Sequence, residues 1–248
     1  MDKIFGILLT LIAGLFFLIG GLISLKVKNK EKLNAFSISL AIVIILNLIF
    51  IDLFPEALEM LEKYKFKIVF LISSILLGII TLKILDKYIP HHHHEHHENE
   101  KNIEEHKSHV SHIGTLTIIS LVLHNIIEGF AIFGLSLTDI KSGILICISI
   151  ALHNIPLGTH IFSSIEPKSN KLLIMLLTLS SLLGGILFLI IGEVSSLVLG
   201  IIIGITIGML IYIALFELLK EIIVNKSKKE TKLGLVIGLI LVIISLFI

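Results

Sequence analysis

The sequence predicts an all-α membrane protein with eight transmembrane helices in one bundle and both termini outside. Three observations support this prediction. Hydrophobic residues make up 55% of the 248 residues, with a mean hydropathy of +1.04. Eight apolar runs have about the length of 20 residues that a helix needs to cross a bilayer. The lysines gather in alternate connecting segments, as expected when the connections lie on alternate sides of a membrane.

The eight apolar runs occupy most of the chain and leave little sequence for a soluble domain. They cover residues 4–25, 33–54, 67–86, 113–137, 142–164, 171–192, 194–219 and 233–248, and the last is the shortest. No small-residue cleavage site follows the first run before Lys26, so we expect it to remain as a helix. We therefore predict helices 1–3 in residues 1–86 and helices 4–8 in residues 113–248, as parts of one membrane domain.

The distribution of lysines predicts the orientation. All 20 basic residues are lysines, and 15 of them lie in segments 26–32, 83–112, 165–171 and 220–232. Positively charged connections stay in the cytoplasm, so these four segments are predicted to be inside and both termini outside. Cys147 is the only cysteine, which excludes an intrachain disulfide.

The connection at 87–112 is the strongest change of composition in the chain. It holds nine of the twelve histidines and is otherwise mostly charged or polar, so we expect a disordered cytosolic loop. Neutral imidazoles in a flexible segment bind zinc-like ions weakly. One interpretation is a tract without a role. The interpretation we favour is an accessory metal-capturing or metal-sensing loop, whose candidate ligands are His91, His92, His93, His94, His96 and His97.

Two similar polar motifs, HNIIEG and HNIPLG, interrupt the fourth and fifth runs near their centres. Polar side chains are costly within a bilayer unless they face a partner, a cavity or an ion. His124 and Glu128 are four residues apart and share a helix face, where together they can bind a borderline divalent cation. In the second motif His153 is followed by Leu157 at four residues and by His160 at seven. The alternative is a hydrogen bond between helices.

Other residues of the two motifs shape the predicted site. Asn125 and Asn154 lie on adjacent helix faces and can offer carbonyl oxygens to an ion. Pro156 removes a backbone donor, so we expect it to kink or loosen the fifth helix. Gly129 and Gly158 allow neighbouring helices to approach closely.

Acidic residues elsewhere in the runs are candidates for a cation pathway. Asp52 and Glu56 belong to DLFPEALE at the end of the second run. They form either a solvated acidic cap or an electronegative entry that concentrates cations. Glu217 lies inside the seventh run, where core pairing and pathway lining are equally compatible with its position.

With these motifs, the sequence resembles the ZIP family of divalent-metal transporters (Zrt/Irt-like proteins). The resemblance extends over nearly the whole chain: DLFPEALE, the His-rich loop, HNIIEG, HNIPLG and YIALFELLKE. It implies eight helices, outside termini and a cytosolic His-rich loop, in agreement with the lysine distribution. It also implies a metal site on the fourth and fifth helices, with the ligands His124, Asn125, Glu128, His153 and Asn154.

Two departures from the family pattern predict one metal ion at the site rather than two. The fifth-helix glutamate of the family motif HNxPEG is Leu157 in this chain. A glutamate that many members carry in the sixth helix corresponds to Ser181. His160 is the candidate to replace part of the missing ligand set.

The sequence therefore predicts a transporter that moves zinc, or a similar ion such as Fe²⁺, Mn²⁺ or Cd²⁺, into the cytosol. The alternative is a membrane metal sensor or buffer that does not transport. An enzyme is not expected, and the zinc-protease motif HExxH is absent. We expect a multi-pass protein of the plasma membrane whose partners are metal ions and lipid, with no nucleic acid. A homodimer is a further expectation.

Overall fold

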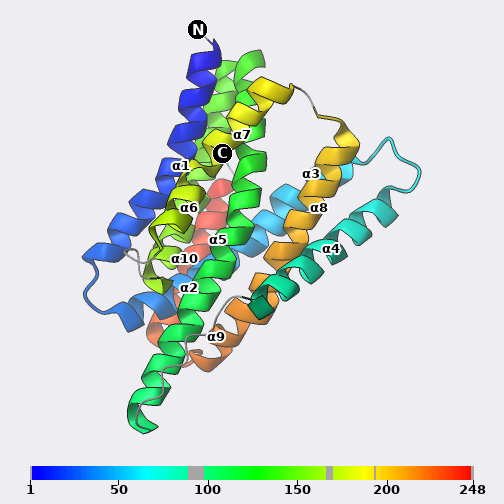
Figure 1. Ribbon diagram of the computed structural model, residues 1–248. Coiled ribbons are helices and arrows are strands. Elements are labelled where there is room, and N and C mark those ends of the chain that lie inside the picture. The colour runs from blue at the N-terminus through cyan, green and yellow to red at the C-terminus, as the bar shows by residue number, and fades with distance from the viewer. Residues whose placement is uncertain (1, 89–97, 166–169, 193, 247–248) are drawn as a thin grey trace.

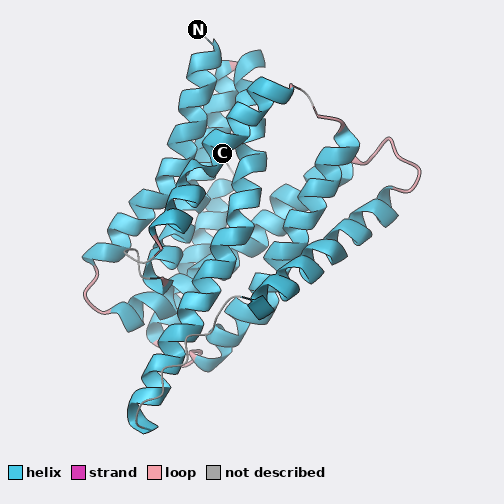
Figure 2. Ribbon diagram, viewed as in Figure 1, coloured by secondary structure: helices cyan, strands magenta, loops and turns pink. Residues whose placement is uncertain are grey.

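The computed structural model describes residues 2–88, 98–165, 170–192 and 194–246. Within these ranges the chain is helical and contains no strand, as Figure 2 shows. The prediction of an all-α protein is confirmed for this part of the chain. The elements in order are α1 Asp2–Lys26, α2 Lys30–Asn47, η1 Leu48–Leu53, α3 Phe54–Met60, α4 Lys67–Tyr88, α5 Glu98–Thr138, α6 Ile140–Ser164, α7 Lys171–Ile191, α8 Ser196–Tyr212, η2 Ile213–Leu218, α9 Leu219–Val224 and α10 Lys229–Ser245.

Seven helical segments of the described chain are long and apolar enough to cross a membrane. They are Lys3–Lys26, Lys30–Met60, Lys67–Lys87, Ile113–Leu137, Ile140–Ser164, Lys171–Ile191 and Ser196–Val224. The chain is thus an integral membrane protein with several passes. The eighth predicted span corresponds to α10, whose 17 residues are one turn or so shorter than the typical 20-residue span. The structure therefore supports seven of the eight predicted spans by length and composition.

The second span continues through two changes of helix type. The wider π-helical turn η1 joins α2 to α3, and Pro55 lies at the start of α3. A proline inside an α-helix collides with the carbonyl group four residues before it, here that of Ile51. A π-helical turn at this point makes room for the ring, and such turns are frequent at functional sites. The acidic residues of DLFPEALE consequently lie within one continuous helical segment.

Helix α5 begins at Glu98, so residues 98–112 of the segment that composition predicts to be disordered form part of a helix. Glu and Lys are good helix formers and are frequent in this stretch. Extending a helix that the membrane-spanning part has already nucleated also costs little. At 1.5 Å per residue, the 41 residues of α5 reach roughly 60 Å, so the helix extends beyond the rest of the bundle, as Figure 1 shows. Residues 89–97, with the six candidate loop ligands, lie outside the described residues.

The helices pack in three sets, and Figure 1 shows the pair α4 and α8 to one side of the bundle. Helices α1, α5, α6 and α7 pack extensively on one another, while α2 packs on α10 and α4 on α8. Glycines bring the first set together. A Cβ atom at Gly129 would overlap the Ser181 carbonyl of α7, and one at Gly158 would overlap the Phe17 carbonyl of α1. The predicted close approach at both glycines is confirmed.

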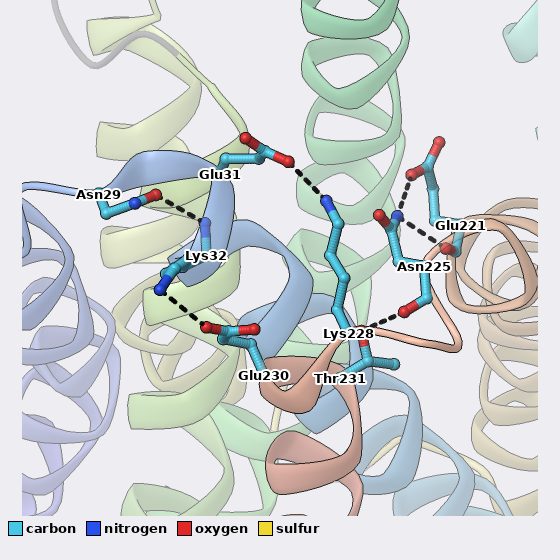
Figure 3. Close-up of polar contacts among 8 residues, drawn as sticks. All are labelled: Asn29, Glu31, Lys32, Glu221, Asn225, Lys228, Glu230 and Thr231. Carbon is cyan, nitrogen blue, oxygen red and sulfur yellow. Dashed lines mark hydrogen bonds and ion pairs between the residues drawn. The ribbon is translucent and has the colours of Figure 1, made fainter.

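Polar contacts fasten α2 to the start of α10 at one end of the molecule (Figure 3). Lys228 Nζ lies 2.6 Å from Glu31 Oε1, and Lys32 Nζ lies 3.4 Å from Glu230 Oε1. A backbone N–H and, to a smaller extent, the Lys32 ammonium lower the pKa of the Glu230 carboxyl. Nearby, the Thr231 hydroxyl donates to the Asn225 carbonyl over 2.9 Å. These contacts fix the turn that leads into the last helix.

The close packing of α1 on α7 gives a first prediction. A Cβ atom at Gly14 would overlap the Thr178 carbonyl, so Gly14→Val must push the two helices apart. We expect this overpacking to cost about 1–3 kcal/mol and to lower the unfolding temperature of the detergent-solubilised protein. Ile12→Val, on the exposed face of the same helix, serves as the control and should leave that temperature nearly unchanged. Equal unfolding temperatures for the two variants would contradict the packing described.

Candidate metal centre

Three potential metal ligands from α5 and α6 meet in the interior of the bundle. His124 Nε2 and His153 Nε2 each lie 2.9 Å from Glu128 Oε1. The ligand atoms of all three residues are within 4.8 Å of one another. His124, Glu128 and His153 have side chains that are only 1%, 10% and 14% exposed. We call these three residues the His–Glu cluster.

The cluster arises from a local and a long-range relation. His124 and Glu128 meet because residues four apart share a helix face. His153 comes from α6, which packs against α5 so that the two imidazole rings lie 6.0 Å apart between centroids. The spacing rule predicted the first pair, and the structure adds His153 to the same carboxylate.

The donor set suits a borderline divalent cation. Imidazole nitrogen and carboxylate oxygen bind zinc at about 2.0–2.2 Å, so tetrahedral ligand atoms lie roughly 3.3 Å apart. The two separations of 2.9 Å in the cluster are only a few tenths of an ångström shorter. A small outward movement of the three side chains is therefore sufficient to admit an ion between them. Glu128 Oε2 makes no hydrogen bond with the described residues, which leaves this oxygen available as a ligand.

The two predicted asparagines directly follow the cluster histidines in the sequence, and both are buried. Asn125 and Asn154 are each 0% exposed. Asn154 Nδ2 donates to the Ala13 carbonyl of α1 over 3.1 Å, which fixes its amide. The Oδ1 atoms of both residues have no hydrogen-bond partner among the described residues. A buried carbonyl oxygen without a donor is costly unless an ion or water compensates it. Their role as ligands remains a prediction.

A small pocket lies between α2–η1, α6 and α10, and His153 is one of its lining residues. His153, Asp52, Asn47, Ser149 and Ser245 are its polar lining residues. One imidazole thus takes part in the cluster and borders the pocket.

Pro156 affects the same part of α6. Helix α6 continues through Pro156 from Ile140 to Ser164, so the proline does not end the helix. The ring still deprives the Leu152 carbonyl of its helical donor. Leu152 is itself one of the residues that line the pocket.

The acidic residues of the second span belong to the surroundings of the cluster. Asp52 lies close enough to His153, Glu128 and His124 to interact with them electrostatically. Glu56 interacts in the same way with His124 and Glu128. Because Asp52 and Glu56 lie close to the cluster, an electronegative entry for cations is a better interpretation of these residues than an acidic cap far from the site.

The residues that depart from the family pattern are both fully buried. Leu157 is 0% exposed and belongs to the hydrophobic core. Ser181 is also 0% exposed, and its Oγ atom has no hydrogen-bond partner among the described residues. Its backbone adjoins Gly129, the neighbour of Glu128 in sequence. Neither position supplies a carboxylate.

Two other candidates do not join the cluster. His160 was expected to replace part of the missing ligand set, but its ligand atoms do not meet those of the three cluster residues. Seven residues of helix place it roughly 10 Å beyond His153 along α6. Glu217 is 5% exposed within η2 and interacts electrostatically with Tyr212. It too lies outside the group of meeting ligand atoms.

Asn47 is a further polar residue near the cluster that the sequence motifs did not indicate. Its Oδ1 atom is buried without a hydrogen-bond partner in the described structure, and the residue lines the pocket with Asp52 and His153. The indication was available, because an amide in the middle of an apolar run is costly in lipid. The sequence alone did not reveal the π-helical turn after Asn47. In such a turn, residues five apart, such as Asn47 and Asp52, lie on the same face of the helix.

A comparison with protein-family models identifies the family. Residues 90–246, more than half of the chain, match the model of the ZIP zinc transporter family. The chain belongs to this family. The match confirms the resemblance, although it begins at residue 90 and leaves the first three predicted helices outside it. Comparison with individual curated proteins gives no match.

Membership establishes the general class of function. ZIP proteins are transporters of zinc or related divalent metals and are not enzymes. The described structure adds the buried His–Glu cluster, whose imidazole nitrogens and carboxylate oxygens are suitable ligands for such an ion. For a transporter the metal is the substrate, so the cluster is a candidate transport site.

Proposed function

We propose that this protein carries Zn²⁺, or a similar divalent cation, across a membrane into the cytosol by way of the His–Glu cluster. The observation that supports the proposal most strongly is the meeting of His124, Glu128 and His153 around one carboxylate oxygen. A cluster that is almost at metal-binding separations, inside a multi-pass bundle, is unusual for residues that serve packing alone. Fe²⁺, Mn²⁺ and Cd²⁺ are further candidate substrates.

Binding exchanges protons for the ion. In the metal-free cluster, the Glu128 carboxylate accepts a hydrogen bond from His153 when Nε2 carries the proton. To coordinate a cation, His124 and His153 must present unprotonated Nε2 atoms. The proton at His153 Nε2 therefore has to leave or move to Nδ1 when the ion enters. We expect metal binding to weaken as the pH falls.

Entry follows the acidic side of the pocket. Asp52 and Glu56 attract a cation, and Asp52 shares the pocket with His153. The ion then binds to the imidazole of His153 and moves on to Glu128, whose Oε1 atom lies 2.9 Å from His153 Nε2. Negative charge at the pocket attracts the cation first, and the Glu128 carboxylate then binds it at the cluster, so we expect the ion to move from the pocket to the cluster.

The direction into the cytosol rests on the proposed topology. With eight helices and outside termini, the lysine-rich connections lie in the cytosol. Seven candidate spans and the shorter helix α10 are compatible with this topology. We place the protein in the plasma membrane and expect a homodimer.

The central site is proposed to hold one ion. A second ion needs its own ligands, and the two positions that would supply them by family resemblance are Leu157 and Ser181. Glu128 is then the only carboxylate of the two motifs, so its single negative charge must balance the charge of the ion. Because one carboxylate neutralises only one of the two positive charges of the ion, we expect the affinity of the site for a divalent cation to be moderate.

The experiment that tests the function is uptake of radiolabelled zinc by proteoliposomes containing the purified protein. We expect accumulation above that of empty liposomes, and competition by excess Cd²⁺ or Mn²⁺ if the site accepts them. Zinc binding by the protein in detergent without any uptake would contradict transport and would favour the sensor or buffer.

The His-rich loop is predicted to be an accessory. Replacing the six histidines with asparagine keeps the loop's length and polarity while it removes the imidazoles. Because these residues are far along the chain from the cluster, we expect zinc uptake by the variant to remain within about twofold of the wild type. Loss of uptake with normal insertion would show that the loop belongs to the pathway. The replaced positions are His91, His92, His93, His94, His96 and His97.

A further inference from the structure

His160 is a buried polar residue that the His–Glu cluster does not use. The residue is 0% exposed within α6. Its Nδ1 atom lies 3.3 Å from Ser164 Oγ, and its Nε2 atom has no hydrogen-bond partner among the described residues. A buried ring nitrogen without a partner costs free energy, so its presence inside an apolar bundle calls for a ligand.

The hydrogen bonds around Ser164 determine which nitrogen of His160 is free. The Ser164 hydroxyl has one hydrogen, and the closest acceptor is the His160 carbonyl oxygen at 2.9 Å. With that hydrogen donated, Ser164 Oγ accepts from His160 Nδ1–H, which leaves an unprotonated lone pair at Nε2. Metal-binding histidines have this arrangement, in which one ring nitrogen donates to an oxygen and the other coordinates.

More oxygen atoms line the neighbouring face of α2. Ser164 Oγ lies 3.4 Å from Asn34 Oδ1, and Ser163 Oγ lies 2.7 Å from Ser37 Oγ. Hydroxyl and amide groups therefore bridge α6 and α2 next to His160. Oxygen atoms of this kind can complete the coordination of a cation that an imidazole holds.

The location of His160 suggests when an ion would meet it. The residue follows His153 by two turns on much the same face of α6, toward the end that leads into the lysine-rich segment 165–171. It lies where α6 packs on α2, two helices that belong to different packing sets. An ion that leaves the cluster toward that end along this interface passes His160.

We propose that His160, oriented by Ser164, is a second binding point for the transported divalent cation on its way from the His–Glu cluster to the cytosolic side. The inference rests on the proposed function. The imidazole, hydroxyl and amide groups described at this point carry no negative charge, so they bind an ion more weakly than the Glu128 carboxylate does. Weak binding suits an exit, since transport requires that an ion be accepted and then released.

The test changes the chemistry of the ligand and measures metal selectivity. His160→Cys replaces imidazole with a softer sulfur ligand, which favours Cd²⁺ over Zn²⁺. We expect the ratio of cadmium to zinc uptake by proteoliposomes to rise several-fold over the wild type. Thr159→Cys is the matched control, because Thr159 is also buried in α6 but donates to the Gly20 carbonyl instead. It should leave the ratio unchanged.

An unchanged ratio in an active His160→Cys variant, or the same change in both cysteine variants, would overturn the inference. The proposed function would survive that result, whereas absence of zinc and cadmium uptake by the wild type would contradict the function itself. If the cysteine variant does not insert, His160→Asn substitutes a harder oxygen ligand. The ratio should then fall below that of the wild type, and a wild-type ratio would again refute the second binding point.

Discussion

Glu128→Ala should reduce zinc uptake to the level of empty liposomes while the protein still folds and inserts. Glu128 Oε1 is the atom that both imidazole nitrogens approach at 2.9 Å, so its removal leaves two histidines without the charge that balances the cation. Once the carboxylate is gone, His124 and His153 can remain neutral, so no unpaired charge is left in the interior and the protein should still fold. Radiolabelled zinc uptake and size-exclusion chromatography of the same preparation measure the two properties.

Two further variants control this experiment. Glu62→Ala removes an exposed carboxylate at the end of the second helical segment and should leave uptake close to the wild type. Glu128→Asp keeps the charge but shortens its reach, and we expect partial uptake with weaker affinity. Undiminished uptake by a correctly inserted Glu128→Ala protein would remove this residue from the mechanism.

Leu157→Glu should add about one bound divalent ion per chain to the central site. The new carboxylate would lie one turn after His153, at the position where the family motif has its glutamate. Two carboxylates in one site repel each other, so that one keeps its proton unless cations lie between them. Bound metal removes that penalty, and the extra ion should be lost first as the pH falls. Equilibrium dialysis with metal analysis at matched pH gives the stoichiometry.

Leu157→Gln is the matched control, because it has the same size and polarity as the glutamate variant without the charge. Both proteins should carry the loop with asparagine in place of histidine, so that loop binding does not obscure the count. Equal stoichiometry of Leu157→Glu and wild type would contradict the single-ion site. The tighter site need not transport faster, since an ion held more strongly is released more slowly.

The sequence predicts the spans because lipid imposes a simple requirement. A helix in the bilayer must satisfy its own backbone and show apolar side chains, so long apolar runs correspond directly to helices. The segment from Lys30 to Met60 shows the limit of this argument, because hydropathy gives no indication of the π-helical turn η1 within it. The helical start at Glu98 was missed for another reason. Composition indicates a solvated segment, but it does not include the low cost of extending an existing helix.

The site was predictable to the extent that it depends on local spacing. His124 and Glu128 share a face by periodicity, and the repeated motif suggested His153 as their partner. The position of His160 was not predictable in the same way, because only packing decides which residues of α6 face α5 and which face α2. Asn47 was overlooked since its significance depends on a pocket formed with Asp52 and His153 from distant parts of the chain.

A crystal structure of the protein grown with zinc, with anomalous scattering measured at the zinc absorption edge, tests directly whether the His–Glu cluster binds the ion. We predict one zinc ion between His124 Nε2, His153 Nε2 and the Glu128 carboxylate, at about 2.0–2.2 Å from each ligand atom. The same peak should be missing in Glu128→Ala crystals. An empty cluster in a protein that transports zinc, or two ions at the cluster, would contradict this prediction.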